Sequence, residues 1–443
     1  MGQRTRTVSV MVAGMIAGSL LVTPAAAHVG TAIQRLSNRP IRALSTQLFD
    51  TRTQGGALVT PDDLGDYCGR SAANPRSYPS GPCTDVRHLN IAEGYGITAS
   101  LSLTLGADGL PIASYWSPNT GRELRTAQCD NPTCTAGINI SQAEANPGDP
   151  NLNLVGVETS IAIGADGLPV IAHWDEHDGD LIVTHCGNAA CSFGNQSTTA
   201  VEGSGAQLGS LPSIAIGSDK LPVMTYFDDT ANVLLLTRCN DVACAGQDES
   251  LTTVDTGTDG PSSITIGVDG LPIISYAKGG LLKTAHCGNA ACDSGNVMHT
   301  LDAGGGAGRS SITIGLDGNP VMSYVVGGFP GYHVKVAHCG NASCTSGNTT
   351  KTIGPGGTDT AIAIGFNGTP YLSYFLETTQ FVADTYLKVV HCGNATCSSG
   401  NVTKTLGPIY AGSHTDLVVG IDGRPLVAYW QQFGTLVFVR PKI

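Results

Sequence analysis

Aromatic side chains gather at one repeated position of this 443-residue chain, and their surroundings are suited to binding. A phrase that begins as SLTLGADGLPIASYW at Ser102 recurs seven times, and its last residue is aromatic in five copies. These five residues, which include all three tryptophans, are Trp116, Trp174, Phe227, Phe375 and Trp430. A flat aromatic ring beside carboxylates suits a sugar, whose apolar face stacks while its hydroxyls are bound. The position therefore predicts a ligand-binding site.

Acidic residues follow this position directly in two copies of the phrase. They are Asp175, Glu176, Asp178 and Asp180, with His177 among them, and then Asp228 and Asp229. Several oxygens close together can hold Ca²⁺, which accepts six to eight of them, so Ca²⁺ is the candidate cofactor, although the sequence does not fix one. The alternative is that the aromatic residues are core packing and the acids a solvated loop.

Catalytic motifs are absent from the sequence. We find no nucleophile elbow, Walker loop, His-Glu-x-x-His helix or dinucleotide fingerprint. Asp175 and Asp228 could serve acid–base hydrolysis, and His177 or His414 a lyase, but no spacing in the sequence supports these roles. Whether the protein is an enzyme is therefore left open, with a carbohydrate-active hydrolase or lyase as one alternative.

The cysteines form seven pairs, six of them with the spacing Cys-x4-Cys. The pairs are Cys68 and Cys83, Cys129 and Cys134, Cys186 and Cys191, Cys239 and Cys244, Cys287 and Cys292, Cys339 and Cys344, and Cys392 and Cys397. Each short spacing joins the ends of two predicted strands, where a disulfide can form, so we predict seven local disulfides. Zinc is the alternative, because His185, His286, His338 and His391 precede the first cysteine of their pairs. We expect these histidines instead to pack between the repeated units.

The repeated phrase predicts the fold. Its shared glycine falls at Gly106, Gly164, Gly217, Gly267, Gly315, Gly365 and Gly420, in steps of 48 to 58 residues. Each unit contains four short β patterns separated by turn signals, and its Asp-Gly pair suits a tight hairpin. This is the pattern of one propeller blade, so we predict an all-β, seven-bladed propeller with four antiparallel strands per blade. A solenoid is the alternative all-β array.

The two ends of the repeat array complement each other. The seventh unit has three strand patterns, and the missing fourth pattern stands ahead of the first unit, near residues 84–91. We therefore predict that this N-terminal strand completes the C-terminal blade and closes the ring.

Strand connectivity sorts the loops of such a propeller onto two faces. The Asp-Gly turns and the cysteine loops, nearly alike in every unit, lie on a uniform face; the loops that differ between units lie on the other, which we call the variable face. Loops that vary between repeats are where function is expected. All the candidate ligand-binding residues named above lie on the variable face.

The N-terminus predicts export. Arg4 and Arg6 precede an apolar run that ends at Ala25-Ala26-Ala27, so we expect a signal peptide at 1–27, a linker or lead-in at 28–67 and the propeller at 68–443. The apolar run is too short to span a membrane. We expect a secreted, extracellular monomer.

Composition limits the partners. Only 13% of the residues are charged, which excludes a coiled coil and a charge-rich disordered chain. The net charge of −12 would repel a phosphate backbone, so we expect no nucleic acid partner.

The SIAIGxDGLPxxSY phrase and the CGNAAC-SGN loops resemble secreted bacterial propeller-repeat proteins. The xDG hairpins more distantly resemble virginiamycin B lyase and NHL-type seven-bladed propellers. The resemblance implies the scaffold, and no catalytic residue of the lyase maps onto this chain. We expect a propeller that binds a glycan or a cell-surface partner on its variable face, with a structural or adhesion role as a further alternative.

Overall fold

The computed structural model describes residues 85–88, 100–117, 121–145, 155–201, 208–246, 249–328, 331–377, 385–406, 414–431 and 435–443. All of them belong to one unit, residues 66–443. The predicted signal peptide, the lead-in at 28–67 and the predicted disulfide between Cys68 and Cys83 lie outside the described residues.

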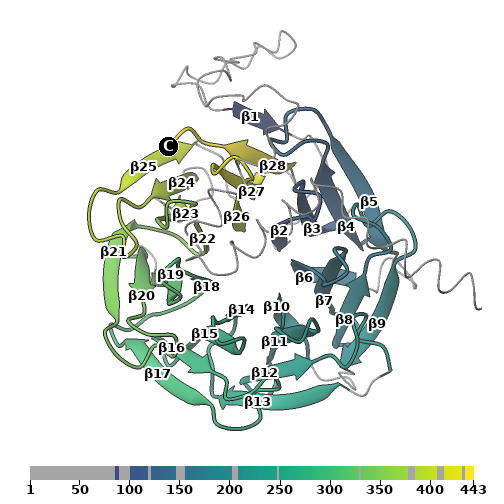
Figure 1. Ribbon diagram of the computed structural model, residues 1–443, viewed down its shortest axis with the longest axis horizontal. Helices are drawn as coiled ribbons and strands as arrows, with labels where there is room; N and C mark the ends of the chain where they lie inside the picture. The colour runs from purple at the N-terminus through teal and green to yellow at the C-terminus, as the bar shows by residue number, and fades with distance from the viewer. Residues whose placement is uncertain are drawn as a thin grey trace, which may run out of the picture. The chain divides into compact units, whose positions relative to one another are not determined.

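Seven antiparallel sheets of four strands stand as blades around one axis, which confirms the predicted propeller (Figure 1). The described residues contain no helix, and hence none long and apolar enough to cross a membrane. Blade 1 consists of β2 (Leu101–Leu105), β3 (Pro111–Ser117), β4 (Glu123–Cys129) and β5 (Ile138–Glu144), and blade 2 of β6 (Val155–Ile163), β7 (Pro169–Asp175), β8 (Asp180–His185) and β9 (Gln196–Val201). Blade 3 consists of β10 (Ser210–Ile216), β11 (Pro222–Asp228), β12 (Val233–Arg238) and β13 (Ser250–Thr256), and blade 4 of β14 (Ser262–Ile266), β15 (Pro272–Lys278), β16 (Leu281–His286) and β17 (Val297–Asp302). Blade 5 consists of β18 (Ser310–Ile314), β19 (Pro320–Val326), β20 (His333–His338) and β21 (Thr349–Pro355), and blade 6 of β22 (Thr360–Ile364), β23 (Pro370–Glu377), β24 (Thr385–His391) and β25 (Val402–Leu406). Blade 7 consists of β26 (Thr415–Val419), β27 (Pro425–Gln431), β28 (Thr435–Arg440) and β1 (Asp85–His88).

The repeated phrase forms the two inner strands of each blade. In blade 1, β2 and β3 pair antiparallel through a turn in which Asp108 Oδ1 accepts a hydrogen bond of 2.9 Å from the Leu110 amide. Gly109 follows with φ 77°, a left-handed conformation that glycine adopts without strain. All seven residues of β3 are buried, because the second strand of a blade packs against neighbouring blades on both faces. The same Asp-Gly pattern thus sets the register of every blade, apart from small substitutions in the turn.

The ring closes as the sequence predicts. Strand β1 pairs antiparallel with β28, with Asp85 opposite Arg440, and the sheet order is β1-β28-β27-β26. Blade 7 is therefore built from both ends of the described chain, which leaves no open sheet edge between the first and last blades.

A belt of hydrogen bonds ties each innermost strand to the next. The serine that opens the phrase accepts a bond from a backbone amide of the following blade, as Ser102 does from Ile161 at 3.2 Å. The same bond is made by Ser160, Ser213, Ser263 and Ser311, at 3.2 to 3.3 Å. Between blades 7 and 1 the acceptor is Asp416, whose Oδ2 lies 2.7 Å from the Leu103 nitrogen. Blade 6 has Ala361 at this position and cannot contribute the bond from its side chain.

Disulfides join the third and fourth strands of six blades, as predicted for the Cys-x4-Cys pairs. Their Cα–Cα distances are 4.7 to 5.0 Å. From blade 1 to blade 6 the bonds join Cys129 and Cys134, Cys186 and Cys191, Cys239 and Cys244, Cys287 and Cys292, Cys339 and Cys344, and Cys392 and Cys397. The described cysteines are all disulfide-bonded, so the zinc alternative has no thiolate ligands among them.

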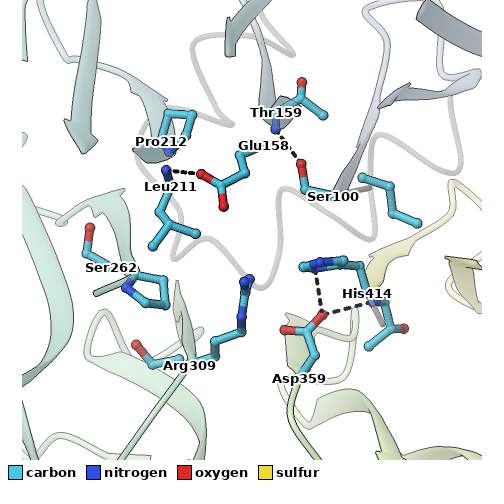
Figure 2. A pocket seen from close by; sticks show the side chains of 13 residues that line it. Ser100, Glu158, Thr159, Leu211, Pro212, Ser262, Arg309, Asp359 and His414 are labelled. Carbon is cyan, nitrogen blue, oxygen red and sulfur yellow. Dashed lines mark hydrogen bonds and ion pairs between the residues drawn. The ribbon is translucent and has the colours of Figure 1, made fainter. Parts of the chain in front are cut away.

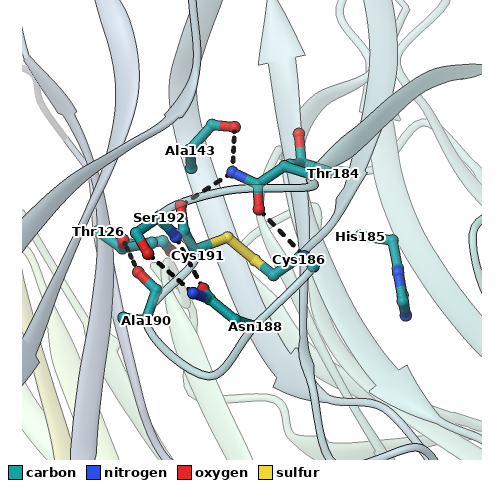
Figure 3. The surroundings of a disulfide bond; sticks show 12 residues. Thr126, Ala143, Thr184, His185, Cys186, Asn188, Ala190, Cys191 and Ser192 are labelled. Carbon is teal, nitrogen blue, oxygen red and sulfur yellow. Dashed lines mark hydrogen bonds between the residues drawn. A yellow bond between two sulfur atoms is a disulfide. The ribbon is translucent and has the colours of Figure 1, made fainter.

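The disulfide loops also tie neighbouring blades together. Figure 3 shows the loop of blade 2, in which the Asn188 side chain accepts a bond from the Ser192 amide at 2.8 Å. Thr126 of blade 1 donates to the Ala190 carbonyl of this loop at 2.9 Å. The loop is therefore fixed both within its own blade and against the preceding one.

The residue before the first cysteine in six blades, and Arg440 at the same position of blade 7, contacts the turn between the first two strands of its own blade. His185 Nε2, for example, lies 2.8 Å from Asp166 Oδ2. Equivalent contacts join Gln128 to Asp108, Arg238 to Asp219, His286 to Asp269, His338 to Asp317, His391 to Thr369 and Arg440 to Asp422. Since any residue able to bond a carboxylate or hydroxyl serves here, glutamine and arginine can replace histidine. Packing of the histidines between blades stays a prediction.

Candidate functional site

A polar pocket of about 130 Å³ lies where the seven innermost strands converge (Figure 2). We call it the axial pocket. It is lined by the first and second residues ahead of the repeated phrase, and so it opens where the loops of the variable face lead into the strands. Its lining residues are Ser100, Leu101, Glu158, Thr159, Leu211, Pro212, Pro261, Ser262, Arg309, Ser310, Asp359, His414 and Thr415.

One repeat position supplies the charged groups of this pocket. The residue two places ahead of the phrase is, from blade 1 to blade 7, Ser100, Glu158, Leu211, Pro261, Arg309, Asp359 and His414. No two blades share the same residue there, although the phrase that follows is nearly constant. The scaffold therefore holds seven different side chains around one point.

Glu158 sits on a bulge of β6, between the Val157 and Thr159 pairs with β7. Its φ of 56° is in the left-handed region, which costs a non-glycine residue roughly 1 kcal/mol or more and is found often at functional sites. The bulge turns the carboxylate toward β10, where it accepts a 2.6 Å hydrogen bond from the Leu211 amide. Burial raises the pKa of Glu158, and the nearby Asp229 and Glu176 add to the rise, while the Leu211 bond and Arg309 oppose it.

Asp359 and His414 form the opposite side of the pocket. Asp359 Oδ2 accepts a 2.9 Å hydrogen bond from the Thr415 amide and lies 3.7 Å from His414 Nδ1. Burial raises the pKa of Asp359. Burial lowers the pKa of His414 to about 3, and Arg309 adds to this, so the imidazole is neutral at ordinary pH.

Arg309 points into the pocket between Glu158 and Asp359 (Figure 2). Its charge acts on the pKa of Glu158, Asp359 and His414 alike. The guanidinium nevertheless makes no hydrogen bond or ion pair within 4.0 Å to another described residue. Among the described residues, then, a cation with five N–H donors faces the cavity with its donors available.

The predicted aromatic residues lie in the interior. The exposed fractions are 8% for Trp116, 7% for Trp174, 6% for Phe227, 0% for Phe375 and 6% for Trp430. The three tryptophans belong to one hydrophobic cluster, in which Tyr115 and Trp430 meet edge to face with centroids 5.7 Å apart. This burial favours the packing alternative, and ligand stacking on these rings stays a prediction.

The predicted acidic residues form two turns that follow β7 and β11. Asp175 is buried and accepts bonds from the amides of His177 and Asp178 at 3.0 and 3.3 Å. Burial raises the pKa of Asp175. Asp180 stands opposite Asp175 in the hairpin, while Glu176, His177 and Asp178 are exposed.

Asp228 plays the same structural role in the next blade. Its Oδ1 accepts bonds of 2.9 Å from the amides of Thr230 and Ala231, and Asp229 beside it is exposed. Across the residues that the structure describes, no three His, Cys, Asp or Glu side chains are arranged to hold a metal ion. The Ca²⁺ hypothesis therefore gains no support from these turns.

Sequence reasoning named the variable face but missed Glu158, Arg309 and Asp359, and it considered His414 only as a lyase residue. The signal was available, because the residue two places ahead of the phrase differs in every copy. This position lies outside the repeated phrase that defines the unit, so the comparison of repeats does not single it out.

Comparisons with known proteins support the fold alone. Hydrazine synthase of Kuenenia stuttgartiensis superposes with a TM-score of 0.51 at 10% identity, covering 83% of this chain and 100% of that one. An alpha-L-arabinanase of Penicillium chrysogenum, complexed with arabinobiose, gives 0.47 at 12% identity, with 68% and 95% covered. A protein of unknown function from Dyadobacter fermentans gives 0.44 at 11% identity, with 81% and 99% covered. No protein-family profile and no curated protein matches the sequence.

Proposed function

We propose that this protein is a secreted ligand-binding propeller that holds one small polar ligand, such as a single sugar unit of a glycan, in the axial pocket. The observation that carries the proposal is the convergence of Glu158, Arg309, Asp359 and His414 from one repeat position of four blades. Strain at Glu158 supports it, because a strained backbone at a pocket wall is a feature of binding sites.

The size of the pocket restricts the ligand. A cavity of about 130 Å³ is smaller than the roughly 300 Å³ at which pockets for drug-sized molecules begin, so it suits one small unit of a ligand. The acidic turns at Glu176 and Asp229 act on the pKa of Glu158 and so lie near the pocket. They are proposed to contact the remainder of a larger ligand, together with the other candidate residues on the variable face.

Export is part of the proposal. Six cysteine pairs at disulfide distance suggest an oxidising, extracellular environment. With the signal peptide at 1–27 and the lead-in at 28–67, the mature propeller of residues 68–443 would meet glycans or cell-surface proteins outside the cell.

Titration calorimetry of the purified protein against a panel of monosaccharides tests the binding. We expect binding that is lost or at least tenfold weaker in Glu158→Gln, because the variant removes a charge-assisted hydrogen-bond acceptor from the pocket. Asp293→Asn, an exposed change in a cysteine loop of the uniform face, is the matched control and should bind as the unchanged protein does. Equal binding by all three proteins would refute the assignment of the pocket, and absence of binding to any saccharide would refute the function.

Glycoside hydrolysis is a second candidate, because the carboxyl groups of Glu158 and Asp359 line the same cavity. In such a hydrolase one carboxyl group acts as the general acid and a second, ionised one acts as the base or nucleophile. Product analysis after incubation with any bound oligosaccharide separates the two functions. A hydrolase shortens the oligosaccharide and loses this activity in Asp359→Asn, whereas a binding protein leaves it intact.

A further inference from the structure

We propose that the ligand of the axial pocket carries a carboxylate, as a hexuronic acid does, and that Arg309 binds this group. The inference rests on the proposed function and specifies its ligand class.

The guanidinium of Arg309 is the group that most needs a partner. It points into the cavity, and no described residue lies within ion-pair distance of it. A partly buried guanidinium is most stable when an anion accepts two of its N–H donors, and a carboxylate matches the geometry of this fork. Its carboxylate neighbours do not meet that need, since Glu158 bonds the Leu211 amide and Asp359 bonds the Thr415 amide.

The hydroxyl groups of the pocket wall are already engaged in the scaffold. Ser100 Oγ accepts a 2.6 Å bond from the Thr159 amide. Other wall hydroxyls pair across blades, Thr159 with Ser114, Ser262 with Thr225, Ser310 with Ser275 and Thr415 with Ser373, at 2.7 to 2.9 Å. The described groups left to select a ligand are therefore mainly the guanidinium, the two carboxyl groups and the neutral imidazole.

One side of the cavity is apolar. Leu211, Pro212 and Pro261 line it from blades 3 and 4, and Figure 2 shows Leu211 and Pro212 on the side away from His414. A pyranose ring has an apolar face that packs on such a wall and hydroxyls that bond the carboxyl groups of Glu158 and Asp359. The Arg309 guanidinium would then bind a third part of the ligand, a negatively charged substituent of the ring.

An amine ligand fits this arrangement less well, although acidic groups are present. Arg309 faces the same small cavity as Glu158 and Asp359, so a cationic ligand would be placed beside a fixed positive charge. Burial also raises the pKa of both acids, which weakens their attraction for a cation. Because the imidazole of His414 is neutral, it neither adds to nor opposes the charge of the ligand.

The experiment compares galacturonic acid, its methyl ester and galactose, which differ in the charge at one ring substituent. Calorimetry at pH 5 with the unchanged protein should show galacturonate binding at least tenfold tighter than either neutral sugar. Arg309→Gln should weaken galacturonate binding at least tenfold and so remove this preference. Arg309→Lys keeps the positive charge but lacks the paired N–H donors of the guanidinium, so it should retain part of the preference for galacturonate. Lys351→Gln, an exposed change on β21, is the control for the loss of one positive charge.

The outcomes separate the inference from the proposed function. If galactose binds in the axial pocket as tightly as galacturonate, or if Arg309→Gln keeps the preference, the carboxylate assignment is wrong while sugar binding stands. If none of the three sugars binds, both the assignment and the proposed sugar-binding function are overturned. Thermal melting of each variant shows that it is folded, and Arg309→Lys decides the question if Arg309→Gln does not fold.

Discussion

Replacing Asp416 by serine should change how the stability of the propeller depends on pH. Asp416 holds the place that serine holds in five other blades, and its Oδ2 accepts the Leu103 amide of blade 1 at 2.7 Å. Burial raises the pKa of Asp416 from 3.8 to about 7, and the nearby Asp359 adds to the rise. The junction between blades 7 and 1 is thus the one described junction of the belt whose acceptor titrates.

The direction in which stability changes with pH follows from proton binding by the folded and unfolded states. Between pH 4 and pH 7 the folded protein holds a proton on Asp416 that the unfolded chain has released, so the free energy of unfolding falls as the pH rises. A difference of about three pKa units corresponds to about 4 kcal/mol at most. Because the side chain is only partly buried, solvent screens the charge and we expect about 1 to 3 kcal/mol.

Urea unfolding of the variant and the unchanged protein at several pH values between 4 and 8 measures this effect. Asp416→Ser should become more stable relative to the unchanged protein as the pH rises, by about 1 to 3 kcal/mol over the range. Asp416→Asn, which keeps the shape without the charge, should follow the serine variant. Parallel curves for all three proteins would refute the argument, because they would show that Asp416 releases its proton at the same pH in both states.

Three further predictions concern the scaffold. Deleting residues 84–93, which include β1, should leave the edge of β28 open and give an aggregating or unfolded protein in circular dichroism and size-exclusion chromatography; a monomeric, cooperatively melting product would contradict the closure. Replacing Cys186 and Cys191 together by serine should lower the free energy of unfolding by about 2 kcal/mol in urea titrations, and no loss would mean that the disulfide adds nothing to its hairpin. Gly156→Ala should cost more than about 1 kcal/mol, since φ is 90° and the new Cβ would lie 2.8 Å from the Leu124 Cα; unchanged melting would show that this backbone can relax.

The blades could be predicted from the sequence because the information lies in short, repeated patterns. Strand alternation and the Asp-Gly turns give the hairpins, and the steps between Gly106 and Gly420 give the number of blades. The same comparison of repeats predicts the closing strand near residue 85. Each of these signals is local in the chain.

The candidate site could be predicted only in part, because it depends on where side chains point. Trp174 ends a repeated phrase on the variable face, yet packing between blades covers its ring. Glu158 enters the axial pocket through a bulge of β6, which no local pattern predicted. Arg309 and Asp359 are 50 residues apart in sequence, and only the ring brings both to one cavity.

The closure of blade 7 also determines the order in which the propeller can fold. Each described disulfide joins cysteines five positions apart within one blade, so its blade can form as soon as those residues are available. Asp85 pairs with Arg440, however, and this contact spans nearly the whole ring. Contacts so distant in sequence form slowly, because a long loop must close before they add stability. We therefore expect blades 1 to 6 to assemble progressively as the chain emerges and blade 7 to complete the ring in the slowest step.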